Sequence, residues 1–462
     1  MKNLNKVLLN YLRNFGSKII FTDHHKSYTG KEFLKKVLSY KSQLNLLWQN
    51  QEFKGLAIIL DRDIDYISII FATWLCGGFY VPLSTETPKS KNKNFIDISK
   101  VNLVVYKKKK KLFFKKITNR KNIDFFKKNN LAYIIFTSGS TGEKKAVCIS
   151  RENIFNYIKS IKKVFKNRYH PKSIIINGEL TFDITLADFA FAFIFKSEII
   201  LTNSSKNLLS LLHLIKRRNV ESIYLVPTTL KRLILLVKKL NLSLVSSVKQ
   251  INCGGEKLSI ALINDTRKIF KDVKIYNFYG PTEFTVNSTF YALNKSKSLK
   301  EIPIGKVLPG IEYLIKKEKN SNKGELFLAG KQLMKGYLNY KNPFIKIKNK
   351  IYYPTGDIVK ENKKREIFFI GRNKDYIKYK GYRINLSSIE QEISKKLKLN
   401  IAVKISKNKL ILFVESRESK ILNNKIKKII NSKLEFFERP EKIYFKKRFP
   451  TLTSGKIDIK KI

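Results

Sequence analysis

The chain has 462 residues, a hydrophobic fraction of 43% and a formal net charge of +57. Such a length exceeds one compact core, so two or more domains are expected. No apolar run approaches the roughly 18 residues of a membrane span, and the first residues lack the apolar region and cleavage site of a signal peptide, so we expect a cytoplasmic protein without membrane contact. The cysteines, Cys76, Cys148 and Cys253, are scattered singly, which fits reduced thiols and neither a disulfide framework nor a zinc cluster.

The positive charge raises the question of nucleic-acid binding. Lysine is spread along the whole chain beside abundant Ile, Asn and Phe, whereas Gly (20) and Pro (11) are few, a composition expected from an AT-rich genome. The densest basic run, residues 106–130, is interpreted as a solvated face, as most charge runs are. We therefore do not expect nucleic-acid binding as the main function, and a basic nucleic-acid-binding protein stays the alternative from another class.

Strand-like and helix-like segments alternate along the first part of the chain. Strand candidates occupy 55–61, 172–178, 221–227 and 273–280, and helix candidates occupy 65–77 and 208–219. This alternation predicts an α/β fold, a layered domain with a largely parallel sheet.

The pattern of predicted elements changes after about residue 310. Shorter strand candidates lie at 325–330 and 366–371, and a final segment offers a helix at 386–397 and strands at 400–406 and 409–416. We place a boundary near Asn373, which predicts an N-terminal α/β core of residues 1–372 with a small β-rich subdomain, followed by a small α+β domain of residues 373–462.

The segment "YIIFTSGSTGEKKAV" (133–147) begins as a buried strand and ends in glycines, hydroxyls and lysines. Glycines let successive N–H groups converge on an anion, and hydroxyls and a lysine add donors, so the segment is a candidate phosphate loop. It is not a Walker A loop, because only two residues separate Gly139 from Gly142 and no Ser or Thr follows either lysine. The alternative is a Ser/Gly-rich surface turn between a strand and a helix.

Further motifs occur in a fixed order around this segment. They are "GGFYVPLSTETP" (77–88), "FDIT" (182–185), "NCGGEKL" (252–258), "NFYGPTEFT" (277–285), "YYPTGDIV" (352–359), "GRNKDYIKYKGYR" (371–383) and "PTLTSGKID" (450–458). The series resembles the adenylate-forming superfamily, and most closely its amino-acid-activating branch: the adenylation domains of nonribosomal peptide synthetases and the D-alanine:carrier-protein ligases. The resemblance covers the chain from about residue 20 onward.

The resemblance implies an enzyme that joins a carboxylate to the α-phosphate of ATP, releases pyrophosphate and then transfers the acyl group to a thiol, with ATP and Mg²⁺ as cofactors. The phosphate loop would hold the outer phosphates through Thr137, Ser138, Gly139, Ser140, Thr141, Gly142 and Lys145. The family usually places Pro and then Lys-Gly after the second glycine, whereas this chain has Glu143, Lys144, Lys145 and Ala146. That difference leaves open which ammonium reaches phosphate.

Other nucleotide contacts are implied by the remaining motifs. Tyr279 would lie against adenine, Thr282 on the α-phosphate and Glu283 on Mg²⁺, a hard cation that prefers oxygen ligands. The remaining candidate nucleotide-binding residues are Gly255, Glu256, Asn277, Asp357 as the acceptor of the ribose hydroxyls, and Arg372. Tight turns with solvated carboxylates are the alternative for the segments around Glu283 and Asp357.

Asp183 indicates the substrate class. In amino-acid-activating relatives an Asp in this "FD" context pairs with the α-ammonium of the substrate, a charge-assisted bond in a partly dehydrated pocket. The alternative is a helix N-cap, since a helix-like segment follows. By position in the motifs, the pocket would be lined by Ile184, Ala187, Tyr224, Asn252, Gly254, Phe278, Val286 and Asn287. Lys374 conflicts with this assignment, because acyl-CoA synthetases often carry Lys at that hinge position.

The resemblance assigns Lys456 to the bridge between the substrate carboxylate and the α-phosphate, and makes residues 373–462 a mobile lid that carries it. Lys456, Glu283 and Thr282 are therefore the candidate catalytic residues. The expected function is a stand-alone amino-acid-activating ligase that loads the phosphopantetheine thiol of a separate carrier protein. An acyl- or aryl-CoA ligase of the same superfamily is the alternative.

Overall fold

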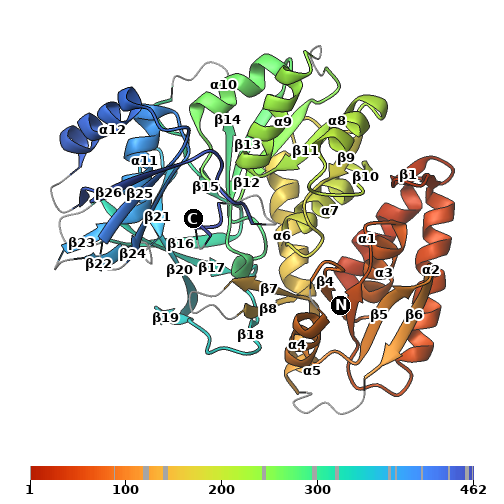
Figure 1. Cartoon of the computed structure of the whole chain (residues 1–462). Coiled ribbons are helices and arrows are strands. Elements are labelled where there is room, and N and C mark those ends of the chain that lie inside the picture. The colour runs from red at the N-terminus through yellow and green to blue at the C-terminus, as the bar shows by residue number, and fades with distance from the viewer. Residues whose placement is uncertain are drawn as a thin grey trace. The chain divides into compact units, whose positions relative to one another are not determined.

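The computed structural model describes residues 2–87, 89–117, 124–138, 144–241, 246–293, 299–317, 322–372, 376–379, 382–406, 409–434, 438–452, 457–459 and 461–462. The chain divides into two compact units (Figure 1): unit 1 comprises 1–313 and 328–353, and unit 2 comprises 314–327 and 354–462. The predicted α/β fold is confirmed by alternating helices and mixed sheets. The boundary placed at 372/373 from the sequence stays a prediction.

A mainly parallel sheet forms the larger part of unit 1. Its strands follow the order β15-β14-β13-β12-β11-β9-β10-β1-β2. Their bounds are β1 (Ile19–Thr22), β2 (Ser27–Thr29), β9 (Ser173–Ile176), β10 (Glu198–Leu201), β11 (Ser222–Leu225), β12 (Gln250–Gly254), β13 (Lys274–Tyr279), β14 (Thr289–Leu293) and β15 (Lys306–Val307). Strands β1 and β9 to β13 run parallel to one another, whereas β2 pairs antiparallel with β1 at one end of the sheet and β14 and β15 add antiparallel pairings at the other. The strands predicted at 172–178, 221–227 and 273–280 are therefore present.

A second sheet of unit 1 has the order β18-β8-β7-β4-β3-β5-β6. Its strands are β3 (Gly55–Ile59), β4 (Phe79–Leu83), β5 (Leu103–Lys108), β6 (Lys111–Lys116), β7 (Leu131–Ser138), β8 (Lys144–Ser150) and β18 (Gly336–Tyr337). Strands β3, β4, β5 and β7 pair in parallel, whereas β6, β8 and β18 are antiparallel to their neighbours. The candidate phosphate loop therefore connects two antiparallel neighbours, β7 and β8.

Helices cover these sheets. They are α1 (Lys2–Asn14), α2 (Gly30–Leu47), α3 (Ile64–Leu75), α4 (Lys89–Ser99), α5 (Asp124–Asn129), α6 (Arg151–Phe165), α7 (Ile184–Phe195), α8 (Leu208–Arg217), α9 (Pro227–Lys239) and α10 (Ile260–Ile269). Several begin at a side chain that accepts a backbone N–H: Thr29 caps α2, Ser150 caps α6 and Ser259 caps α10. Helix α7 is apolar on nearly all sides, as expected of a helix buried at the centre of a domain.

Unit 2 is smaller. Parts of β16 (Ile311–Lys317), β17 (Lys323–Gly330) and β20 (Lys350–Glu361) lie in it, and β21 (Ile367–Arg372) pairs with β20. The remaining elements are β22 (Tyr376–Tyr379), β23 (Tyr382–Asn385), α11 (Leu386–Leu397), β24 (Ile401–Ser406), β25 (Lys409–Glu415), α12 (Lys420–Lys433) and β26 (Lys442–Lys446). Helices α11 and α12 pack through Ile389, Ile393 and Ile426 against β24 and β25. The β19 strand (Ile345–Ile347) pairs with the first residues of β20 within unit 1.

Among the described residues, no helix combines the length and the apolar character that a membrane crossing requires.

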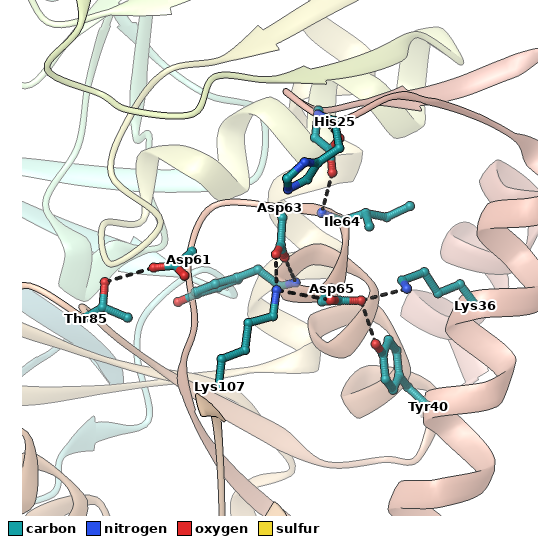
Figure 2. Close-up of polar contacts among 11 residues, drawn as sticks. His25, Lys36, Tyr40, Asp61, Asp63, Ile64, Asp65, Thr85 and Lys107 are labelled. Atoms are coloured by element: carbon teal, nitrogen blue, oxygen red, sulfur yellow. Dashed lines mark hydrogen bonds and ion pairs between the residues drawn. The ribbon is translucent and has the colours of Figure 1, made fainter. Parts of the chain in front are cut away.

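An aspartate–lysine cluster of Asp63, Asp65, Lys36 and Lys107 ties the start of α3 to α2 and β5 (Figure 2). Lys107 pairs with Asp63 and, at 3.3 Å, with Asp65. Asp65 also accepts from Lys36 at 2.7 Å and from the Tyr40 hydroxyl at 2.6 Å. Burial disfavours the charge of Asp65, but the bonds from Lys36 and Tyr40 outweigh it and hold the pKa of Asp65 below its usual value.

We expect Asp65→Asn to lower the free energy of unfolding by about 1.5–3 kcal/mol at neutral pH, because hydrogen bonds to a charged group are lost. A depressed pKa in the folded state contributes stability above the pKa of the unfolded chain, and this contribution is lost as the pH falls through the folded value. Urea unfolding between pH 3 and 7 should therefore show the difference from the parent shrinking with acid. Asp265→Asn, which breaks an exposed pair with Lys238, is the control and should change little. A difference for Asp65→Asn that is constant with pH would contradict the account.

Candidate active site

Neighbouring parallel strands bring several predicted pocket residues together. Tyr224 on β11 lies beside Asn252 on β12, and Gly254 lies beside Phe278 on β13. The Tyr224 and Phe278 rings have centroids 5.8 Å apart. A Cβ on Gly254 would stand 2.5 Å from the Tyr224 hydroxyl, so a side chain there would displace Tyr224. The carboxyl ends of parallel strands are where α/β folds bind ligands, which makes this cluster a candidate substrate wall.

The turn after β13 adds Val286 and Asn287 to the same cluster. Val286 has φ +69°, an uncommon conformation for a β-branched residue, and a Cβ on Gly280 would meet its carbonyl oxygen. The Asn287 Oδ1 accepts from the Tyr224 hydroxyl at 3.0 Å, and its Nδ2 donates to the Tyr157 hydroxyl at 2.9 Å. A strained turn therefore holds Asn287 in a buried hydrogen-bond network.

Asp183 stands at the N-cap position of α7 but makes no side-chain capping bond. Its position therefore agrees with the helix-cap alternative, but the capping interaction is missing. Desolvation, together with the nearby charge of Glu283, raises the pKa of this half-buried carboxyl to about 6, although hydrogen bonds from Thr282 and from the backbone N–H groups of Asp183 and Ile184 oppose the shift. Ile184, the next residue, packs against Gly178, and Ala187 is buried on the same helix. The structure thus links Asp183 to Thr282, a candidate contact of the α-phosphate.

Glu283 belongs to the short 3₁₀ helix η1 (Thr282–Phe284) that follows β13. Its Oε1 accepts a hydrogen bond of 2.7 Å from the Tyr337 hydroxyl, and its carbonyl accepts from the Met334 N–H at 2.9 Å. Thr282 and Glu283 therefore present one side chain toward Asp183 and the other toward Tyr337.

The candidate phosphate loop is described at its two ends. Thr137 on β7 pairs with Lys145 on β8, and the backbone of Ser138 pairs with Lys144. The ammonium of Lys145 lies 5.0 Å from the Tyr337 ring centroid and 5.3 Å from that of Tyr340. Gly139, Ser140, Thr141 and Gly142 lie outside the described residues.

Two of the other predicted nucleotide-binding side chains already have partners. Glu256 accepts from the backbone N–H of Thr228 at 2.9 Å and from its hydroxyl at 2.7 Å. Asn277 donates to the Pro303 carbonyl at 2.8 Å. These bonds fix the backbone beside Gly255, which has a φ of +80°, and beside Tyr279, which is half-buried. Contacts of Glu256 and Asn277 with a nucleotide stay predictions.

In unit 2, Asp357 on β20 lies opposite Arg372 on β21. Asp357 is buried, and its N–H donates to the Thr355 hydroxyl at 3.1 Å. The antiparallel pairing thus brings the two nucleotide contacts predicted for this unit side by side. Lys374 and Lys456 lie outside the described residues, so the hinge and lysine assignments stay predictions.

Comparison with known proteins decides the family. The family model described as "AMP-binding enzyme" matches residues 10–338. The chain belongs to this AMP-binding enzyme family. The predicted relationship to adenylate-forming enzymes is thereby confirmed, and the chain is an AMP-forming ligase.

Two curated relatives of this AMP-binding enzyme illustrate the similarity. "Dapdiamide synthesis protein DdaD" of Enterobacter agglomerans is 28% identical over 407 residues, which cover 85% of this chain and 68% of the relative. "L-allo-isoleucine:holo-[CmaA peptidyl-carrier protein] ligase" of Pseudomonas savastanoi pv. glycinea is 26% identical over 343 residues, 70% of this chain. The match spans only 57% of that second relative.

The fold of this AMP-binding enzyme is also that of solved structures. The O-succinylbenzoate coenzyme A synthetase MenE from Bacillus subtilis, in complex with ATP and magnesium ion, superposes with a TM-score of 0.77. The alignment covers 98% of both chains at 19% sequence identity, so it shows the fold alone.

Sequence reasoning missed several polar residues of the AMP-binding enzyme. Tyr337 and Tyr353 adjoin Glu283, and Tyr157 completes the network of Asn287. Tyr353 stands in the motif "YYPTGDIV", which gave a usable signal, whereas Tyr337 and Tyr157 come from chain segments without a recognised motif.

Asp188 on α7 was also missed. It is 1% exposed, and neither carboxylate oxygen has a hydrogen-bond partner in the part of the chain that the structure describes. Desolvation raises the pKa of Asp188 well above its usual value, and the charge of Arg62 opposes this shift.

The donors around Glu283 fit magnesium held mainly by a nucleotide. Tyr337 bonds Oε1, and within the described residues Oε2 accepts no hydrogen bond. Within the described ranges no group of three or more His, Cys, Asp or Glu residues is suited to hold a metal ion. Mg²⁺ is usually held by one or two carboxylates together with substrate phosphates and water, so a single available carboxylate suits it.

Proposed function

We propose that this AMP-binding enzyme activates an amino acid with ATP and transfers it to the phosphopantetheine thiol of a separate carrier protein. The carrying observation is Asp183, a half-buried carboxyl without a capping bond that is hydrogen-bonded to Thr282 beside Glu283. A substrate ammonium there would find an anionic partner next to the reacting phosphate. An ammonium would also favour the charged form of a carboxyl that burial alone disfavours.

In the first half-reaction, a carboxylate oxygen of the amino acid attacks the α-phosphorus of ATP, the bond to the bridging oxygen breaks, and pyrophosphate leaves. The protein's share is positioning and electrostatic stabilisation, because such displacements need no covalent protein intermediate. Asp183 would orient the ammonium, Thr282 the α-phosphate, and Lys145 with its loop the outer phosphates. Mg²⁺ at Glu283, when bound, would neutralise charge on the phosphate oxygens.

In the second half-reaction, the carrier thiolate attacks the acyl carbon, a thioester forms, and AMP leaves with the electron pair of the broken bond. We propose that residues 373–462 act as a lid that supplies Lys456 in the first step and rotates for the second. Asp357 and Arg372 would hold the ribose and nucleotide in both steps.

Two observations support the carrier as acceptor. The relative from Pseudomonas savastanoi is named as a ligase of an amino acid and a peptidyl-carrier protein. The net charge of +57 would attract an acidic carrier.

Three buried free cysteines suit a reducing compartment, and we propose the cytoplasm.

An acyl- or aryl-CoA ligase is the second candidate. Lys374 favours it, and so does the fold shared with a coenzyme A synthetase. That enzyme class has no substrate ammonium to pair with Asp183.

We expect ATP–pyrophosphate exchange to depend on an amino acid. The assay would present each common amino acid beside octanoate, coumarate and O-succinylbenzoate, with Mg²⁺ present throughout. Exchange with one or a few amino acids supports the proposal, because only they supply both carboxylate and ammonium. Exchange with the fatty or aryl acids and none with amino acids would replace it with the CoA-ligase function.

A further inference from the structure

We infer that Tyr337 is a positioning residue that orients the Glu283 carboxylate for Mg²⁺ and keeps it apart from Lys145. The inference rests on the proposed role of Glu283 as the magnesium ligand. It is carried by one side chain that contacts both charged groups: its hydroxyl bonds Glu283, and its ring faces the Lys145 ammonium.

The backbone fixes Tyr337 in this place. Strand β18 is antiparallel to β8, with Tyr337 opposite Val147, so Lys145 is the diagonal neighbour two residues along β8. Diagonal cross-strand positions are within reach of aromatic and long side chains. Bonds from Leu338 N–H to the Ala146 carbonyl, 3.0 Å, and from Tyr337 N–H to Asn342 Oδ1, 2.7 Å, extend the pairing.

The hydroxyl of Tyr337 is held as firmly as its ring. The Tyr353 hydroxyl donates a hydrogen bond to the Tyr337 hydroxyl, and the Tyr337 hydroxyl donates to Glu283 Oε1. The three groups therefore form a chain of hydrogen bonds that ends at the carboxylate. Both tyrosines are 7% exposed, so their side chains are largely shielded from water. A carboxylate with one oxygen fixed by a neutral donor presents the other in one direction.

Tyr337 also gives two groups of opposite charge separate contacts. A free Lys145 ammonium and a free Glu283 carboxylate would pair, and each would then lose its capacity for phosphate or metal. Lys145 instead interacts with the rings of Tyr337 and Tyr340, and Glu283 accepts from the Tyr337 hydroxyl. The two groups thereby stay available for a ligand that carries both phosphates and a cation.

The test is ATP binding by calorimetry, measured with Mg²⁺ and again with EDTA, on the full chain. In Tyr337→Phe we expect Mg²⁺·ATP to bind about 10-fold more weakly, because partners that orient a metal ligand typically matter at this scale. Metal-free ATP should bind as in the parent, since the ring still faces Lys145. Half-maximal exchange should require more Mg²⁺ in parallel.

Tyr40→Phe is the matched control. It removes a tyrosine hydroxyl that donates to a carboxylate, Asp65, in the aspartate–lysine cluster (Figure 2). It should leave both affinities unchanged. Tyr353→Phe removes the next donor of the chain and should weaken Mg²⁺·ATP binding by a smaller factor, which keeps the test decisive if Tyr337→Phe does not fold.

A parent chain that binds Mg²⁺·ATP, together with folded Tyr337→Phe or Tyr353→Phe variants of unchanged magnesium dependence, would overturn this inference alone. A parent chain that binds ATP equally with Mg²⁺ and with EDTA would overturn the proposed role of Glu283 and the inference with it.

Discussion

Lys456→Ala is expected to slow aminoacyl-adenylate formation by about 10²–10³-fold, the usual effect of losing one preorganised electrostatic contact in the transition state. The proposed lysine bridges the substrate carboxylate and the α-phosphate, whose negative charges must approach before a bond forms. Transfer from preformed aminoacyl-AMP to the carrier should change little, because the lid would have rotated. Single-turnover assays of each half-reaction measure the two effects separately.

Lys460→Ala and Lys461→Ala are the controls for mere loss of charge in the same basic tail, and both should be nearly silent. A Lys456→Ala variant that behaves like these controls would remove the catalytic assignment. One that cripples both half-reactions equally would remove the two-position lid.

Asp183→Ala is expected to raise the KM for the amino acid while leaving the KM for ATP near the parent value. Removing one partner of a desolvated charge pair costs about 2–5 kcal/mol. The measurement is the steady-state rate of ATP–pyrophosphate exchange over a range of amino-acid concentrations.

Ser259→Ala separates this role from helix capping. Ser259 accepts from the Leu262 N–H as a true N-cap of α10, so its loss should lower stability by about 1 kcal/mol without changing either KM. Asp183 makes no such bond, so Asp183→Ala should raise the KM for the amino acid without lowering stability. An unchanged amino-acid KM in a less stable Asp183→Ala variant would return Asp183 to a capping role.

The sequence predicted the parallel strands well because their apolar runs are short, β-branched and bounded by polar turns, as in β9 (Ser173–Ile176) and β11 (Ser222–Leu225). Strand ends then placed Tyr224, Asn252 and Phe278 on neighbouring strands, as their positions in the motifs implied. These positions could be predicted because each of the three residues lies on its own strand, and each strand is recognisable by itself in the sequence.

Contacts between distant segments could not be predicted in this way. Glu283 meets Tyr337 across 54 residues, and the pairing depends on the two-residue strand β18, which has no periodicity to recognise. The network of Asn287 with Tyr157 joins residues 130 positions apart. Within one turn, the positive φ of Val286 occurs together with the close approach of its carbonyl oxygen to Gly280, a local geometry that propensities do not encode.

The division of the chain into units has a consequence for its synthesis on the ribosome. Residues 314–327 of unit 2 leave the ribosome before residues 328–353, which complete unit 1 and include β18. Strand β17 pairs with β20, so at roughly 5–20 residues per second it waits roughly 2–6 s, from its own end at Gly330 to the end of β20 at Glu361, before this neighbour has been added. During that interval its hydrogen-bonding edge is exposed in the nascent chain. Since Tyr337 arrives with β18, a nascent chain that stops before residue 336 would lack the proposed orienting contact of Glu283.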